Sequence, residues 1–303
     1  MFLKAAFKNA PVYAQLIMIL AIIAFCTIFA IFLVSILIIS KVGISPEAIL
    51  EAQQNILDYP ELLQGSLFLQ TLGVFLFPSI ICAWLFSDNY KEYLSIEQPV
   101  NLSVAFWTII SIIVAVPFLN LTYYFNQQMT FPEAFGWLEN WMKEMESANA
   151  KSLEIILDTK NITTIIFNIL IICVMAGISE EFMFRGLLQK CFSKVIINPH
   201  VLIWTIAILF SAIHFQFYGF ITRMLLGAWL GYLMYYTKTI WIPVLAHFTN
   251  NMLGTGAYYI FRDNPEKIQE LDAYGTGTTW WLSIVSLALF FFCFTKIKKT
   301  VSQ

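Results

Sequence analysis

Long apolar runs separated by short polar stretches dominate the pattern along the chain. A helix needs about 20 mainly apolar residues to cross about 30 Å of hydrocarbon. Runs of about this length or longer cover residues 12–40, 66–87, 102–121, 162–188, 199–215, 219–236, 240–260 and 277–295. No alternation typical of membrane β-strands competes with them. The pattern therefore predicts an all-α membrane protein, a bundle of about eight transmembrane helices.

Two of the polar stretches carry helix signals of their own. Ser45 stands in a capping position before Pro46, which suits the first turn of a helix. The stretch that begins at Phe131 repeats apolar residues at helical spacing up to Met145. We expect two interfacial helices on the outer surface, and they either cover the rim of the bundle or guide a substrate.

Composition supports a membrane protein and excludes one class of partner. Apolar residues make up 59% of the chain, charged residues only 12%, and the net charge is −2. This charge offers no electrostatic basis for binding nucleic acid. The cysteines are scattered, mostly within apolar runs, which indicates packing rather than disulfides. With no internal repeat, residues 1–303 are expected to form a single polytopic membrane domain, with a motif-bearing catalytic core at about 162–260.

The positions of the lysines predict the orientation in the membrane, because cytoplasmic loops are enriched in Lys and Arg. A cytoplasmic N-terminus would place most of the loop lysines on the cytoplasmic side, and most of the acids on the other. We therefore expect both termini in the cytoplasm. The excess of lysine over arginine and the many isoleucines favour a multi-pass protein of a bacterial cytoplasmic membrane.

Charged residues at the end of run 162–188 are the first candidates for chemistry. An ionisable group within a membrane is costly, so it suggests a function. Glu180 and Glu181 are adjacent on a helix and point about 100° apart, so they must have different roles. Arg185 follows Glu181 by four residues, the favourable order for an ion pair on one helix face. This pairing leaves Glu180 as the candidate general base.

Polar residues in two later runs lie at a similar expected depth. His214 is in run 199–215, and His247 and Asn251 are in run 240–260. At about 1.5 Å per residue, all three fall near the mid-membrane level expected for Glu180. His247 and Asn251 are four residues apart, so one helix face presents an imidazole and an amide that can both donate to an oxyanion.

Structural explanations exist for each of these residues taken singly. If the fourth span ended at Ala176, the Glu-Glu-Arg group would be an interfacial cluster. His214 could be a satisfied polar residue near a helix end, and His247 with Asn251 could link helices by hydrogen bonds. His200, which follows a proline at a helix start, is expected to be structural. The coincidence of the other groups at one depth favours a site.

Three motifs follow one another along the chain, each in a different apolar run. They read EExxxR at 180–185, FxxxH at 210–214 and HxxxN at 247–251. In this order they resemble the CPBP (Abi) family of intramembrane proteases, relatives of the type II CAAX prenyl endopeptidase. The resemblance implies hydrolysis of peptide bonds within the membrane.

The resemblance also implies roles for the motif residues. Glu180, helped by His214, would activate a water molecule, and His247 with Asn251 would stabilise the oxyanion. In supporting roles, Glu181 and Arg185 would hold the helix and its electrostatics, and Phe210 would pack rather than react. The implied substrate is a membrane-associated peptide or protein, of CAAX type or a leader or bacteriocin-like peptide.

The need for a metal and two rival functions stay open at this point. Glu180, His214 and His247 could bind zinc with a water in the fourth position. The family is often classed with metalloproteases, whereas a metal-free mechanism is also proposed for its relatives; we favour the latter. Buried Glu and His also mark proton-coupled transporters, and a non-catalytic bacteriocin-immunity protein is a further alternative.

Overall fold

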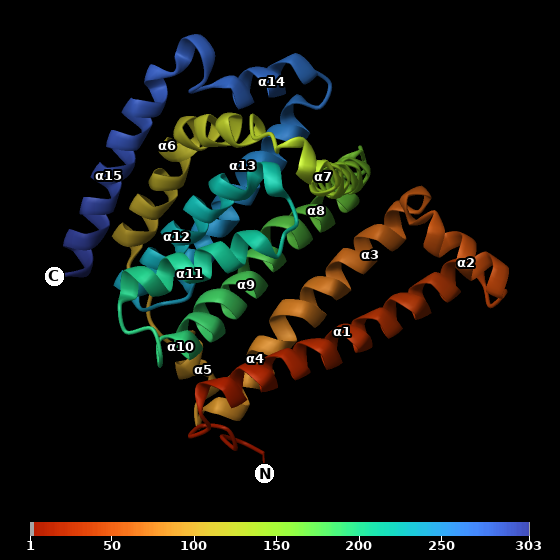
Figure 1. Ribbon diagram of the computed structural model, residues 1–303, viewed down its shortest axis with the longest axis horizontal. Helices are drawn as coiled ribbons and strands as arrows, with labels where there is room; N and C mark the ends of the chain where they lie inside the picture. Colours follow the sequence, from red (N-terminus) through yellow and green to blue (C-terminus); the bar gives the residue numbers. More distant parts are fainter. Residues whose placement is uncertain (1–2, 303) are drawn as a thin grey trace. The chain divides into compact units, whose positions relative to one another are not determined.

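The computed structural model describes residues 3–302, and all regular elements in this range are helices (Figure 1). The predicted all-α class is confirmed. The α-helices are α1 (Val12–Val42), α2 (Pro46–Gln54), α3 (Pro60–Thr71), α4 (Phe77–Phe86), α5 (Tyr90–Tyr93), α6 (Leu102–Gln127), α7 (Gly136–Leu157), α8 (Ile162–Ile169), α9 (Ala176–Glu181), α10 (Gln189–Phe192), α11 (Pro199–Ala212), α12 (Phe220–Thr237), α13 (Trp241–Phe261), α14 (Pro265–Ala273) and α15 (Trp281–Val301).

Shorter helical segments of other types join some of these helices. The π-helices are Leu72–Leu76, Leu170–Met175 and Phe182–Leu188, and the 3₁₀ helices are Ile56–Asp58, Glu133–Phe135, Phe217–Gly219 and Gly277–Thr279. The first π-helix joins α3 to α4, and the other two join α8, α9 and α10. Long, continuous helical segments therefore run from Pro60 to Phe86 and from Ile162 to Phe192.

Five helical segments in the described range are long and apolar enough to cross a membrane: Val12–Val42, Pro60–Phe86, Leu102–Gln127, Ile162–Phe192 and Trp281–Val301. All eight predicted apolar runs are helical over most of their length. The count of eight spans is nevertheless not confirmed, because α11 is shorter and α12 and α13 do not belong to this set. The cytoplasmic position of the termini stays a prediction.

The chain divides into two compact units. The first comprises residues 1–96 and 151–195, and the second comprises residues 97–150 and 196–303, so that one boundary falls within α7. The predicted interfacial helices correspond to α2 and α7. The expectation of one polytopic domain with a catalytic core at about 162–260 stays a prediction.

In the first unit, α1 packs along α3 and α4 (Figure 1). The helices approach closely at Gly73, where an added Cβ atom would lie 2.6 Å from Cβ of Ala30 and 2.9 Å from the carbonyl oxygen of Cys26. Small residues allow this kind of close helix contact in membranes. Elsewhere α1 exposes large apolar side chains, among them Phe25 and Ile28, as a lipid-facing helix would.

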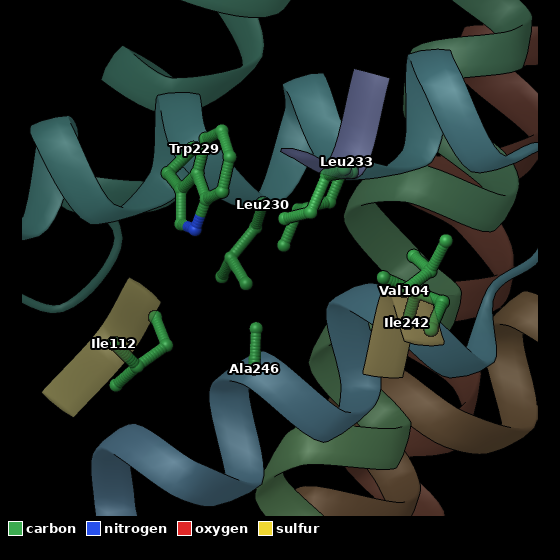
Figure 2. Close-up of a cluster of buried hydrophobic side chains, with 8 residues drawn as sticks. Val104, Ile112, Trp229, Leu230, Leu233, Ile242 and Ala246 are labelled. Carbon is green, nitrogen blue, oxygen red and sulfur yellow. The ribbon is translucent and has the colours of Figure 1, made fainter. Parts of the chain in front are cut away.

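In the second unit, α6 packs against α15 and α13, and α12 packs against α11 and α13. Figure 2 shows the core between α6, α12 and α13, where Trp229 and Leu230 of α12 face Ala246 of α13 and Ile112 of α6. Trp229 also donates from Nε1 to Oγ of Ser111, 3.2 Å away. This hydrogen bond satisfies the indole nitrogen within an apolar core.

A proline lies within α6 in the middle of this unit, and a serine of α15 binds the backbone on both sides of it. Pro117 has no N–H and cannot make its helical hydrogen bond. Ser286 of α15 donates from Oγ to the carbonyl of Val114 at 2.5 Å and accepts from the N–H of Phe118 at 3.3 Å. The hydroxyl thus bridges the carbonyl of Val114 and the N–H of Phe118, which lie in the turn that contains Pro117.

Candidate functional site

The two adjacent glutamates lie in the first unit, between two π-helices. Glu180 and Glu181 end α9, which is preceded by the π-helix Leu170–Met175 and followed by the π-helix Phe182–Leu188. A π-helical turn contains one extra residue, and such turns occur frequently at functional sites. Glu181 is fully buried and Glu180 half-buried. The two carboxylates therefore have different surroundings, as their spacing predicts.

The predicted ion pair between Glu181 and Arg185 is present. Nη1 of Arg185 lies 2.9 Å from Oε1 of Glu181, and both side chains are 0% exposed. A buried guanidinium is tolerated only when a carboxylate and hydrogen bonds replace its water. The charge of Arg185 also acts electrostatically on Glu180. Arg185 thus helps to set the electrostatics around both carboxylates.

In the second unit, Phe210 brings the two predicted histidines together. Its ring centroid lies 5.0 Å from that of His214 and 5.9 Å from that of His247, both with edge-on geometry. Phe210 is 2% exposed, so its ring forms a fixed support between α11 and α13. This agrees with the packing role expected for Phe210.

The position of His214 differs from the prediction that it lies within a helix. α11 ends at Ala212, and His214 lies in the turn that follows. Phe215 has a φ of 51°, the left-handed conformation that ends helices and that costs a residue with a side chain about 1 kcal/mol or more. The helix therefore ends just before His214 although no glycine or proline marks the position.

The end of α11 determines the tautomer of His214. Nδ1 of His214 lies 2.7 Å from the carbonyl oxygen of Phe210, one of the last carbonyls of the helix. A carbonyl can only accept, so Nδ1 carries the hydrogen in this contact. In the neutral imidazole Nε2 is then the acceptor nitrogen, the form that a general base requires.

Three side chains that the sequence did not single out hold the loop after His214. Asn126 of α6 accepts from the N–H of Ile221 at 2.7 Å and donates to the carbonyl of Phe217 at 3.0 Å. Ser211 donates to the carbonyl of Phe220 at 2.7 Å, and Glu146 of α7 accepts from the N–H of Tyr218 at 3.3 Å. The only sequence signal for Asn126 is an amide at the end of an apolar helix.

His247 and Asn251 lie one turn apart on α13, as predicted. His247 is 4% exposed, and Asn251 is half-buried. Oδ1 of Asn251 accepts from Nδ2 of Asn250 at 3.2 Å. The amide oxygen of Asn251 is the acceptor in this contact, and its Nδ2 is the atom that can donate.

His200 has a structural partner, as expected. Its Nδ1 lies 2.8 Å from the hydroxyl of Tyr232 on α12.

The candidate zinc ligands come from both units. His214 and His247 belong to the second unit and Glu180 to the first. Among residues 3–302, neither unit contains a group of three or more His, Cys, Asp or Glu side chains that could hold a metal ion. A zinc site thus has no support within either unit.

One comparison identifies the family of the motif-bearing segment. Residues 162–253 match the family model of the type II CAAX prenyl endopeptidase Rce1-like proteins. Through this segment the chain is similar to the Rce1-like family. The match runs from α8 into α13 and includes all seven predicted site residues. No curated protein and no solved structure matches the chain. With five helical segments among residues 3–302 that are long and apolar enough to cross a membrane, the chain is an integral, multi-pass membrane protein.

Proposed function

We propose that the protein is an intramembrane endopeptidase that hydrolyses peptide bonds of membrane-associated substrates. The observation that carries the proposal is the Rce1-like match over residues 162–253, because it contains the three motifs in order. The substrates proposed are CAAX-type proteins or leader and bacteriocin-like peptides. Hydrolysis at this depth requires a polar, water-filled site that is shielded from lipid.

In the proposed mechanism, Glu180 and His214 activate one water molecule. Glu180 accepts the proton as the water attacks the peptide carbonyl, and it later passes the proton to the leaving amine. The Nδ1 contact with the Phe210 carbonyl supports the role of His214, because it makes Nε2 the nitrogen that can bind the water. The charge of Glu181 is already compensated by Arg185, and the proposed role of Glu181 is to hold the guanidinium of Arg185 in place.

His247 and Asn251 are the proposed donors to the oxyanion. The tetrahedral intermediate carries a negative charge on the former carbonyl oxygen, and fixed donors stabilise it more than they stabilise the substrate. Burial of His247 against Phe210 supports this role because it fixes the ring before the reaction. The donor end of the Asn251 amide supports it as well.

A cleavage assay with purified protein in phospholipid vesicles tests the proposal. The substrate is a quenched peptide that inserts into the membrane, and the variant is Glu180→Gln, which keeps the shape of the side chain. We expect the rate to fall by about 10²- to 10⁴-fold, the usual contribution of a general base.

Glu154→Gln is the matched control, since Glu154 is an exposed carboxylate on α7. It should cleave at the rate of the parent. Cleavage by Glu180→Gln at the parental rate would show that the assignment is wrong. Proton flux into the same vesicles that depends on Glu180, without cleavage, would instead indicate a transporter.

A further inference from the structure

A cavity in the second unit is separate from the motif residues. Its volume is about 450 Å³, and it lies between α6, α11, α12 and α15. The walls are apolar side chains, with Phe118 and Leu119 of α6 opposite Leu287 and Phe290 of α15. None of the seven proposed site residues lines it. A ligand for this cavity must therefore be mostly hydrocarbon.

The length of the cavity matches one leaflet of a bilayer. Its lining on α12 extends from Leu225 to Tyr236. At about 1.5 Å per residue this stretch measures about 16 Å. The hydrocarbon core of a bilayer is about 30 Å thick, so one leaflet is about 15 Å deep. An acyl chain lying along α12 would fit this length.

One end of the cavity is polar and carries a positive charge. His200 and Tyr232, joined by their hydrogen bond, both line it. The ring of Tyr232 stacks on Tyr236 with centroids 6.4 Å apart. Nζ of Lys298 lies 5.1 Å from the centroid of Tyr236 and 5.5 Å from that of Phe294, which also line the cavity. Exposed His200 and Lys298 thus mark its mouth.

Among the described residues, the positive charge of Lys298 has no counter-charge in an ion pair. Throughout residues 3–302, no carboxylate forms an ion pair with Lys298 or with Lys296. Lys296 and Lys298 instead lie over aromatic rings. Basic pockets between transmembrane helices bind the head groups of anionic lipids. A zwitterionic lipid would bring no net charge to compensate these lysines.

We propose that this cavity binds an anionic phospholipid, with one acyl chain along α12 and the phosphate at Lys298 and the His200–Tyr232 pair. The apolar walls select for hydrocarbon, and the polar mouth selects for the negative head group. The site is distinct from the proposed protease site and does not depend on that activity.

Native mass spectrometry of the full chain, delipidated in detergent, tests this proposal. The probes are a palmitoyl-oleoyl phosphatidylglycerol, a phosphatidylcholine with the same chains, and inorganic phosphate. We expect one phosphatidylglycerol to bind, phosphatidylcholine to bind more weakly, and inorganic phosphate not to displace the lipid. Lys298→Gln should weaken phosphatidylglycerol binding about fivefold, the effect of one lysine near a charged head group.

Two further variants make the test specific. Lys299→Gln is the matched control, because the adjacent residue on α15 points about 100° away from Lys298 and does not line the cavity. It should bind phosphatidylglycerol as the parent does. Ala115→Phe places a ring in the cavity and should remove binding. Equal binding of the two lipids, equal effects of Lys298→Gln and Lys299→Gln, or displacement by inorganic phosphate would overturn the proposal.

Discussion

The buried ion pair between Glu181 and Arg185 predicts a large loss of stability when one partner is removed. The pair is 2.9 Å apart and fully buried. At this distance, with an effective dielectric constant of about 20, the Coulomb attraction is about 6 kcal/mol. Desolvation offsets part of this, and removing one partner of a buried pair costs about 3–5 kcal/mol, because the other charge is left uncompensated. We expect Arg185→Met to lower the free energy of unfolding by this amount.

Reversible unfolding by denaturant in detergent micelles measures this loss. Lys143→Met is the matched control, because Lys143 and Glu139 form a pair of the same spacing, 2.7 Å apart, in which Lys143 is exposed and Glu139 is partly exposed. Its removal should change the stability little, as is usual for exposed ion pairs. The double variant Glu181→Leu with Arg185→Met should recover most of the loss, since no charge is left buried. If Arg185→Met unfolds at the same denaturant concentration as the parent, the reasoning about this pair is wrong.

Further predictions concern helix contacts and the loop after His214. Gly73→Ala should destabilise the protein by about 1–3 kcal/mol in the same unfolding experiment, because the added Cβ would meet backbone and side-chain atoms of α1. Gly254→Ala, which has open space around the added Cβ, should be neutral or slightly stabilising. Ser286→Ala should cost about 1–3 kcal/mol by leaving the interrupted turn of α6 unbridged, and a null effect would contradict the bridge. Asn126→Ala should slow peptide cleavage by about 10- to 100-fold through displacement of His214, with substrate binding retained; an unchanged turnover number would show that the loop does not position the histidine.

The helices were predictable from the sequence because every backbone N–H and C=O group of an apolar segment in lipid needs a hydrogen bond within the protein, and a helix provides these along the whole segment. A run such as 162–188 has few alternatives to a helix. The structure confirms a helical segment over Ile162–Phe192. Its π-helical turns were not predictable, because the extra residue in such a turn has no distinctive residue type or spacing in the sequence. The number of crossings is harder still, because α11, with 14 residues, is short for a span.

Within the candidate site, local spacing predicted local contacts. The Glu181–Arg185 pair follows from a separation of four residues on one helix. The end of α11 before His214 was missed, because Phe215 adopts a left-handed conformation that usually calls for glycine. The support from Asn126 was also missed, since its partner Ile221 lies 95 residues away along the chain. Such contacts depend on packing between helices, which residue spacing does not encode.

A double-mutant cycle on cleavage by Glu180→Gln and His214→Ala tests the proposed chemistry most directly. If both groups act on one water molecule, each single variant loses most of the activity, and the double variant is no slower than the slower single variant. The turnover number of purified, folded protein in vesicles is the quantity to compare. Losses that multiply in the double variant, or a Glu180→Gln protein that retains the parental turnover, would contradict a shared water.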